Sequence, residues 1–173
     1  MKNRLNSEQV QWLHDRWKGD ITNKIIIALN EGRSLDPILK KLKKLPDIPN
    51  VDLRLDLRYI DLSHQNLRGP WKKEGDRRVR SGVNLQNADL TGANLTWVIM
   101  PCADLTNSLL YDANLQSAEL IHSDFTKADL TGADLSGAWL LGTKFHFAKV
   151  TEVQLQSRRN LGQMDFDYHA FEI

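Results

Sequence analysis

Apolar residues recur at every fifth position through the second half of the chain. Between Leu85 and Leu155 all fifteen positions of this series are apolar, and the residue two places before each of them is Ala, Val, Ser or Thr. A period of five fits neither an α-helix, which repeats every ~3.6 residues, nor a long strand, which alternates every two. Each unit is therefore expected to be a short extended piece followed by a bend.

The pattern also predicts how these units stack. In a short extended piece, the apolar centre and the small residue two places before it point to one side, while the residue between them points outward. Four bends of about 90° would close a square coil, and the next coil would lie at the strand spacing of about 4.7–4.9 Å. The interior would then be filled by four apolar side chains per coil.

Complete Ala-(Asp/Asn)-Leu triplets carry a resemblance to a known family. They begin at Ala88, Ala93, Ala103, Ala113, Ala128 and Ala133. This region resembles the pentapeptide-repeat proteins, whose motif is Ala-(Asp/Asn)-Leu followed by two variable residues. The resemblance implies an all-β solenoid in the form of a right-handed quadrilateral β-helix, which is a narrow solid tube with little or no interior cavity.

The repeat starts earlier and is interrupted once. Three further units are centred on Leu57, Leu62 and Leu67. The next centre, Leu85, follows Leu67 after 18 positions instead of five, so 13 residues are inserted. We expect residues 51–157 to form one repeat β-helix with an inserted loop at 70–81. Residues 158–173 leave the period and are expected to cap the last coil or to serve as a dimerisation tail.

Residues 1–50 lack the repeat and carry helix signals. Asn6 and Asp20 are candidate N-caps, Gly32 is a candidate helix end, and Asp36-Pro37 suits the start of a third helix. A solenoid does not bury its terminal coil by itself. We therefore expect a short α-helical cap at the N-terminal end of the tube.

Charge is balanced overall and uneven locally. Lys and Arg total 23 against 22 Asp and Glu, a net charge of +1, which argues against direct nucleic-acid binding by the chain as a whole. Residues 70–81 nevertheless carry five basic and two acidic residues, whereas residues 82–157 carry three basic and eight acidic ones. No stretch approaches the ~20 apolar residues of a membrane span, and we expect a cytoplasmic protein without a membrane partner.

The candidate chemistry is sparse. The single cysteine, Cys102, has no evident base partner and excludes an internal disulfide, and the five histidines show no paired metal-ligand spacing. No glycine-rich phosphate-binding motif is present. We therefore expect no enzyme activity, no metal and no cofactor.

Two outward-facing groups are candidate binding surfaces. The first is an apolar set that breaks the polar pattern on one face of the coil: Trp97, Ile99, Pro101, Ile121, Trp139 and Leu141. An exposed apolar patch commonly marks an interface, but the N-terminal helices or the segment 51–58 could equally cover it. The second is the basic loop: Trp71, Lys72, Lys73, Arg77, Arg78 and Arg80. This loop either contacts an acidic protein surface or a phosphate backbone, or is a solvated corner loop.

These features favour a non-enzymatic protein-binding or scaffold module with an unidentified protein partner and a possible homodimer through the C-terminal tail. The resemblance implies an alternative, because some pentapeptide-repeat proteins mimic duplex DNA, bind the type II topoisomerase DNA gyrase and protect it from quinolones. A tube of about 22 Å, from 4.5 coils at the strand spacing, is short for such a mimic. Its net charge of −5 over residues 82–157 is also well below that of DNA.

Overall fold

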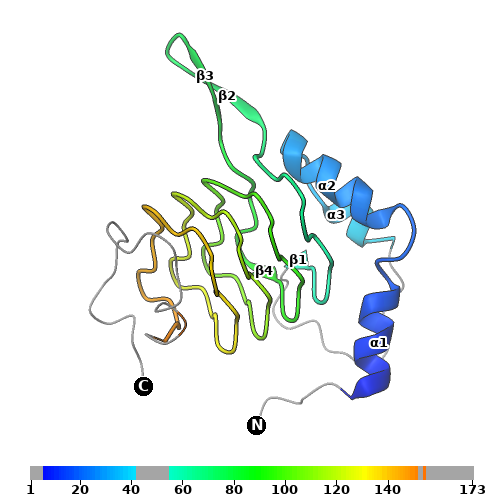
Figure 1. Ribbon diagram of the computed structural model, residues 1–173. Helices are drawn as coiled ribbons and strands as arrows, with labels where there is room; N and C mark the ends of the chain where they lie inside the picture. Colours follow the sequence, from blue (N-terminus) through cyan, green and yellow to red (C-terminus); the bar gives the residue numbers. More distant parts are fainter. Residues whose placement is uncertain (1–5, 42–54, 152–153, 155–173) are drawn as a thin grey trace.

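The repeats wind into a tube of stacked coils. The computed structural model describes residues 6–41, 55–151 and 154, and Figure 1 shows the coils lying side by side along one axis. Parallel bridges join residues 20 positions apart, from Asn84 with Asp104 to Asp129 with Lys149. Four five-residue units therefore complete one turn, and the chain forms a solenoid-like β-helix. Regular strands are brief: β1, Leu55–Asp56, pairs in parallel with β4, Ala88–Asp89.

The coil keeps its register across the insertion. Bridged residues are 33 positions apart before it, as in Asn66 with Ile99, and 20 apart after it. The inserted residues are more regular than the expected loop. Strand β2, Trp71–Glu74, pairs antiparallel with β3, Arg77–Arg80, and the resulting hairpin projects from the tube (Figure 1). Gly75, with φ of 58°, occupies the first of the two turn positions, as a type II′ turn requires.

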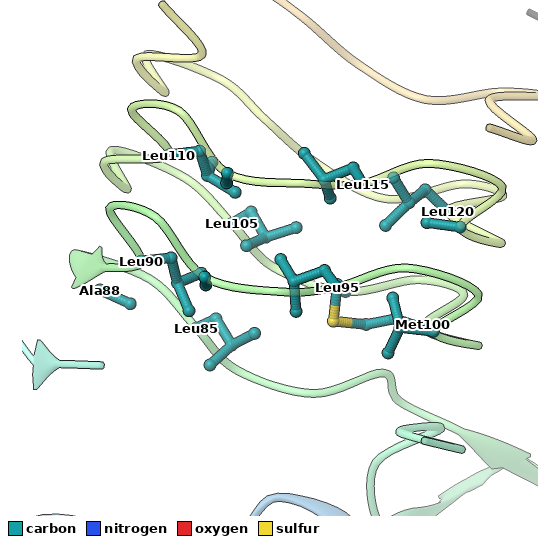
Figure 2. Close-up of a cluster of buried hydrophobic side chains, with 14 of the residues drawn as sticks. Leu85, Ala88, Leu90, Leu95, Met100, Leu105, Leu110, Leu115 and Leu120 are labelled. Atoms are coloured by element: carbon teal, nitrogen blue, oxygen red, sulfur yellow. The ribbon is translucent and has the colours of Figure 1, made fainter. Parts of the chain in front are cut away.

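The interior of the tube is a continuous apolar column. Figure 2 shows the central side chains of two successive coils pointing inward, one above the other. The labelled residues are Leu85, Ala88, Leu90, Leu95, Met100, Leu105, Leu110, Leu115 and Leu120, and all of them are fully buried. In the next coils Phe125 and Phe145 take central positions and stack with ring centroids 5.3 Å apart. Small residues such as Ala88 complete each layer, since little room remains beside four large side chains.

Each bend is a tight turn closed by local hydrogen bonds. In the unit centred on Leu95, Val98 N donates to Leu95 O at 3.2 Å, and Trp97 has a φ of 57°. The outward Asp or Asn also stabilises the turn, because its side chain accepts from the backbone two residues later; Thr106 N donates to Asp104 Oδ1 at 3.0 Å. The repeated Asp and Asn residues therefore stabilise the backbone of their own turns.

Three helices precede the tube within residues 6–41. They are α1, Ser7–Asp15, α2, Ile21–Glu31, and the short α3, Asp36–Leu39. Asn6 caps α1 through a capping box, and Gly32 ends α2 with a φ of 66°. Asp20 makes no side-chain capping bond, and Asp36 is the first residue of α3 instead of its cap. None of the helices in the described residues is both long and apolar enough to span a membrane.

The helices lie beside the β1 end of the tube (Figure 1). Buried side chains of α2 and of the segments that flank it belong to the same hydrophobic cluster as the first coil: Trp17, Ile25, Ala28, Leu29 and Leu35 with Leu57, Ile60, Leu62 and Leu67. Asn30 Nδ2 donates to Asn66 O at 2.9 Å, which fixes α2 against the same coil. The predicted tail at 158–173 lies outside the described residues, as do residues 42–54 of the first two predicted segments.

Candidate functional site

One face of the tube carries the apolar set that the sequence singles out. We call Trp97, Ile99, Pro101, Ile121, Trp139 and Leu141 the apolar face. Pro101, Ile121 and Leu141 occupy the same position in three successive coils, because Cys102 N donates to Ile121 O and His122 N donates to Leu141 O, both at 2.8 Å. The backbone therefore holds these three side chains in a row along the tube axis.

The tryptophans are the most exposed members of the apolar face. Trp97 is 57% exposed and Trp139 41% exposed, while the other four side chains are partly buried. The His64 ring lies parallel to the Trp97 ring, with centroids 6.4 Å apart. Glu119 bridges to both Ile99 and Trp139 in the ladder, so one carboxylate lies inside the apolar face.

The described part of the N-terminal segment forms hydrogen bonds to the first coil. Trp17, which follows α1, donates from Nε1 to Arg58 O at 2.8 Å, and Asn30 of α2 bonds to Asn66. The alternative that segment 51–58 covers the apolar face does not hold for its described strand, because β1 pairs with β4 and continues the ladder of the tube.

The hairpin sorts its charged residues onto two different sides. Cross-strand partners share a face, and alternate residues point to opposite faces. The pairs Trp71 with Arg80 and Lys73 with Arg78 therefore form one face, which we call the basic face. The other face holds the pairs Lys72 with Val79 and Glu74 with Arg77.

The basic face is exposed and built around an aromatic ring. The guanidinium carbons of Arg80 and Arg78 lie 4.3 and 5.6 Å from the centroid of the Trp71 ring. Trp71 is 52% exposed, and the basic residues of both faces are exposed. The structure thus brings together four of the six predicted loop residues and places Lys72 and Arg77 on the opposite face.

The base of the hairpin is tightly packed against the tube. A Cβ on Gly69 would lie 1.8 Å from Gly82 O, and one on Gly82 would lie 1.8 Å from Cys102 O. Both residues have positive φ values, 69° and 74°. Arg80 Nη1 also donates to Gly69 O at 2.7 Å. Glycine is therefore required where the chain leaves and re-enters the coil.

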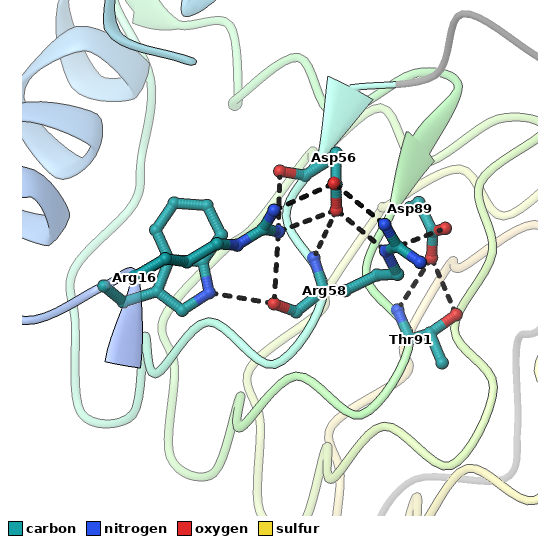
Figure 3. Close-up of polar contacts among 6 residues, drawn as sticks. Arg16, Asp56, Arg58, Asp89 and Thr91 are labelled. Atoms are coloured by element: carbon teal, nitrogen blue, oxygen red, sulfur yellow. Dashed lines mark hydrogen bonds and ion pairs between the residues drawn. The ribbon is translucent and has the colours of Figure 1, made fainter. Parts of the chain in front are cut away.

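A polar network that the sequence analysis missed joins α1's C-terminal side to the first coil (Figure 3). The Arg16 guanidinium donates to both carboxylate oxygens of Asp56, at 2.8 and 2.7 Å. Arg58 donates to the same two oxygens at 2.9 and 3.0 Å, and its Nε lies 3.7 Å from Asp89 Oδ2. Thr91 completes the network by donating from its backbone N and its hydroxyl to Asp89 Oδ1.

This network strongly perturbs its central carboxyl. Burial by itself would raise the pKa of Asp56, but the hydrogen bonds and charges of Arg16 and Arg58 outweigh it, so the pKa lies well below the usual range for aspartate. Burial would lower the pKa of Arg58, whereas its bonds to Asp56 raise it above the ordinary value. The arrangement binds two charged side chains firmly and leaves Asp56 ionised.

The other candidate chemistry is dispersed in the described residues. Cys102, His64 and His122 each occupy an exposed bend position with positive φ. Within ranges 6–41 and 55–151 no group of three His, Cys, Asp or Glu side chains is placed to hold a metal ion.

Comparisons with known proteins agree with this architecture. The family model "Pentapeptide repeats" matches residues 81–110 and 108–146, with 8 copies of the repeat. A pentapeptide repeat protein from the thylakoid lumen of Arabidopsis thaliana is similar in structure, with 25% identity and a TM-score of 0.44; the match covers 56% of this chain and 62% of that protein. Trypsin-treated QnrB1, a plasmid-mediated fluoroquinolone resistance protein, has 14% identity and a TM-score of 0.51, with coverage of 66% and 61%.

The tube of this protein is thus a β-solenoid built from five-residue repeats. Its repeat region, residues 81–146, matches the family of pentapeptide-repeat proteins. The chain spans about three fifths of the length of the two solved structures described above. A search of curated proteins gave no match. The similarity to QnrB1, at 14% identity, supports the fold alone.

Proposed function

We propose that this protein is a non-catalytic protein-binding module and that the apolar face is its contact surface. The observation that carries the proposal is the row of Pro101, Ile121 and Leu141 across three coils, flanked by two tryptophans that are 57% and 41% exposed. Contiguous apolar patches on soluble proteins commonly mark interaction sites. Tryptophan is also among the residues most enriched at the energetic centres of interfaces.

The backbone makes this surface suitable for recognition. Every coil is fixed to the next by parallel bridges, so the side chains of the apolar face are held by rigid main chain instead of a loop. A rigid surface loses little conformational freedom on binding. The partner that fits it is a protein with a flat apolar surface and a donor or cation facing Glu119.

We also propose that the helical segment caps the tube. We further propose that the tube is right-handed, as its resemblance to the pentapeptide-repeat proteins implies. The polar side chains of the helical segment support the capping role, because they donate to backbone carbonyls of the first coil. Trp17 Nε1 donates to Arg58 O at 2.8 Å, Arg16 Nη2 to Asp56 O at 3.2 Å and Asn30 Nδ2 to Asn66 O at 2.9 Å. The end of the tube would otherwise present these acceptors to solvent.

We do not extend fluoroquinolone resistance from QnrB1 to this chain. A mimic of DNA needs a dense row of free negative charge. Here two of the outward carboxylates are paired with lysines: Lys149 Nζ lies 3.2 Å from Asp129 Oδ2, and Lys144 Nζ lies 3.7 Å from Asp124 Oδ2. These lysines neutralise the carboxylates of the preceding coil.

The test combines substitutions on the apolar face with a matched control elsewhere. Protein carrying Ile121→Asp and Trp139→Asp is compared with protein carrying Phe147→Asp, since Phe147 is a 57% exposed aromatic residue outside the apolar face. Partners captured from an extract of the source cells are purified, and their affinity for each protein is measured by calorimetry. The apolar-face substitutions should weaken binding by at least about 30-fold, as the loss of hot-spot residues does. Phe147→Asp should leave the affinity unchanged.

Circular dichroism and light scattering decide between this proposal and its competitors. Both variants should keep the wild-type melting curve. Unfolding of the apolar-face variant would mean that the face is an internal packing surface. A wild-type dimer that the two substitutions convert to a monomer would assign the face to a second copy of the chain. Equal affinities for all three proteins would exclude the apolar face as the contact surface.

A further inference from the structure

The basic face of the hairpin separates its charges from the rest of the protein. The pairing of β2 with β3 places Lys73, Arg78 and Arg80 on one side with Trp71, and both acidic residues of the insertion lie elsewhere. Glu74 points to the opposite face and Asp76 lies in the turn. Three cations therefore share a small surface that contains no carboxylate.

These cations lack acidic partners in the described part of the chain. The carboxylate contacts found there involve residues of the helices and the tube, such as Arg16 with Asp56 and Lys149 with Asp129. Arg80 has one neutral bond, to Gly69 O. The hairpin also projects away from the acidic tube (Figure 1), and at physiological salt the field of exposed charges decays over about 8 Å. The positive potential of this face is therefore available to a ligand.

Trp71 adds a second recognition element. Its ring is packed beside Arg80 and Arg78 on the same face and is still 52% exposed. An aromatic ring beside guanidinium groups is the combination that single-stranded nucleic acids bind, because the ring stacks on an unpaired base while the cations contact phosphates. An acidic protein surface would use the cations alone.

We infer that the basic face of the hairpin, formed by Trp71, Lys73, Arg78 and Arg80, binds single-stranded nucleic acid. Arg78, Arg80 and Lys73 contact the phosphate backbone and Trp71 stacks on one base. The net charge of +1 averages over the whole chain and so does not describe this surface. The inference is independent of the apolar face, which lies on the tube and not on the hairpin.

The number of cations sets the expected dependence on salt. Each neutralised phosphate of a single strand contributes about −0.7 to the slope of log affinity against log salt concentration. Three contacts give a slope of about −2, which corresponds to a loss of about 20-fold between ~50 and ~200 mM salt. The probe is a fluorescein-labelled thymidine or uridine oligonucleotide of about 12 nucleotides, followed by fluorescence anisotropy with the full chain.

The two faces of the hairpin provide a matched control. Lys73→Gln with Arg78→Gln removes two charges from the basic face, and Lys72→Gln with Arg77→Gln removes two from the opposite face. The first pair should reduce the slope to about −0.7 and weaken binding in low salt. The second pair should change the slope little. Trp71→Leu should weaken binding by about fivefold or more, the lower end of the stacking contribution, while Trp71→Phe retains most of it.

Several outcomes would overturn the inference. No binding by the wild type in low salt would exclude it, and equal losses for both double variants would mean that only the total charge matters. A duplex of the same length that binds more tightly than the single strand would remove the stacking role of Trp71. If poly-L-glutamate bound with the same affinity and the same salt dependence as the oligonucleotide, the surface would be assigned to acidic proteins. An NMR amide spectrum with wild-type positions outside the hairpin verifies that each variant is folded.

Discussion

Replacing Asp56 with Asn should weaken the attachment of the helical segment to the tube. The substitution keeps the shape of the side chain but removes the charge that pairs with Arg16 and Arg58. Their side chains are only 8% and 11% exposed, and Asp56 is 21% exposed. Removing one partner of a buried ion pair costs about 3–5 kcal/mol because an uncompensated charge remains. The partial exposure of Asp56 places our expectation near the lower end, at about 3 kcal/mol.

The cost should depend on pH in a defined direction. The folded-state pKa of Asp56 lies below its unfolded value of about 3.9, so the carboxylate stabilises the folded protein above that pH. Its contribution is lost as the pH falls below about 4 toward the folded-state pKa. The difference in the free energy of unfolding between wild type and Asp56→Asn should therefore be largest at neutral pH and shrink in acid.

Urea unfolding, followed by circular dichroism and tryptophan fluorescence at pH 7 and again below pH 3, measures this difference. Asp20→Asn is the matched control, since the Asp20 carboxylate pairs with Lys24 at 3.0 Å on an exposed helix surface. Such a pair is worth less than about 0.5 kcal/mol. A loss below about 1 kcal/mol for Asp56→Asn at pH 7, or a loss that is the same at both pH values, would refute the buried network as a source of stability.

Two further substitutions test the tube itself. Leu110→Ala should lower the free energy of unfolding by about 2–5 kcal/mol through the cavity it leaves in the buried column, and unchanged stability would mean that the assigned register is incorrect. Gly82→Ala should cost about 1–3 kcal/mol more than Gly19→Ala, because both residues have positive φ but only Gly82 would bring its Cβ onto backbone atoms. Urea unfolding measures both effects, and equal losses for the two glycine variants would contradict the close packing at Gly82.

Most of the tube could be predicted from the sequence because each five-residue unit carries its own apolar centre and its own small residue. The centres from Leu85 to Val150 and the small residues two places before them each have one geometric role, and the structure buries them as expected. The hairpin at 71–80 could also have been predicted from the sequence. The Gly75-Asp76 dipeptide between two short runs is a turn signal, but the many charges of those runs resemble a solvated loop.

The Arg16 network could not be predicted in the same way. Asp56 and Arg58 occupy outward positions that in most repeats face solvent, and Arg16 lies 40 positions earlier. Their proximity depends on how the helices pack against the first coil, which no periodic pattern describes. The two faces of the hairpin likewise depend on strand register, and a loop prediction assigns no register to Lys73 or Lys72.

The contact between the helices and the first coil has a consequence for polymerisation. A β-solenoid stacks identical layers, so an uncovered end is a template to which the coil of another molecule can add at the same spacing as the layers within one molecule. At the β1 end of the tube, backbone carbonyls of the first coil accept hydrogen bonds from the side chains of Arg16, Trp17 and Asn30. A chain that lost α1 and α2 would therefore expose a coil to which another molecule can add. Assembly into end-to-end fibres would then compete with the monomeric tube.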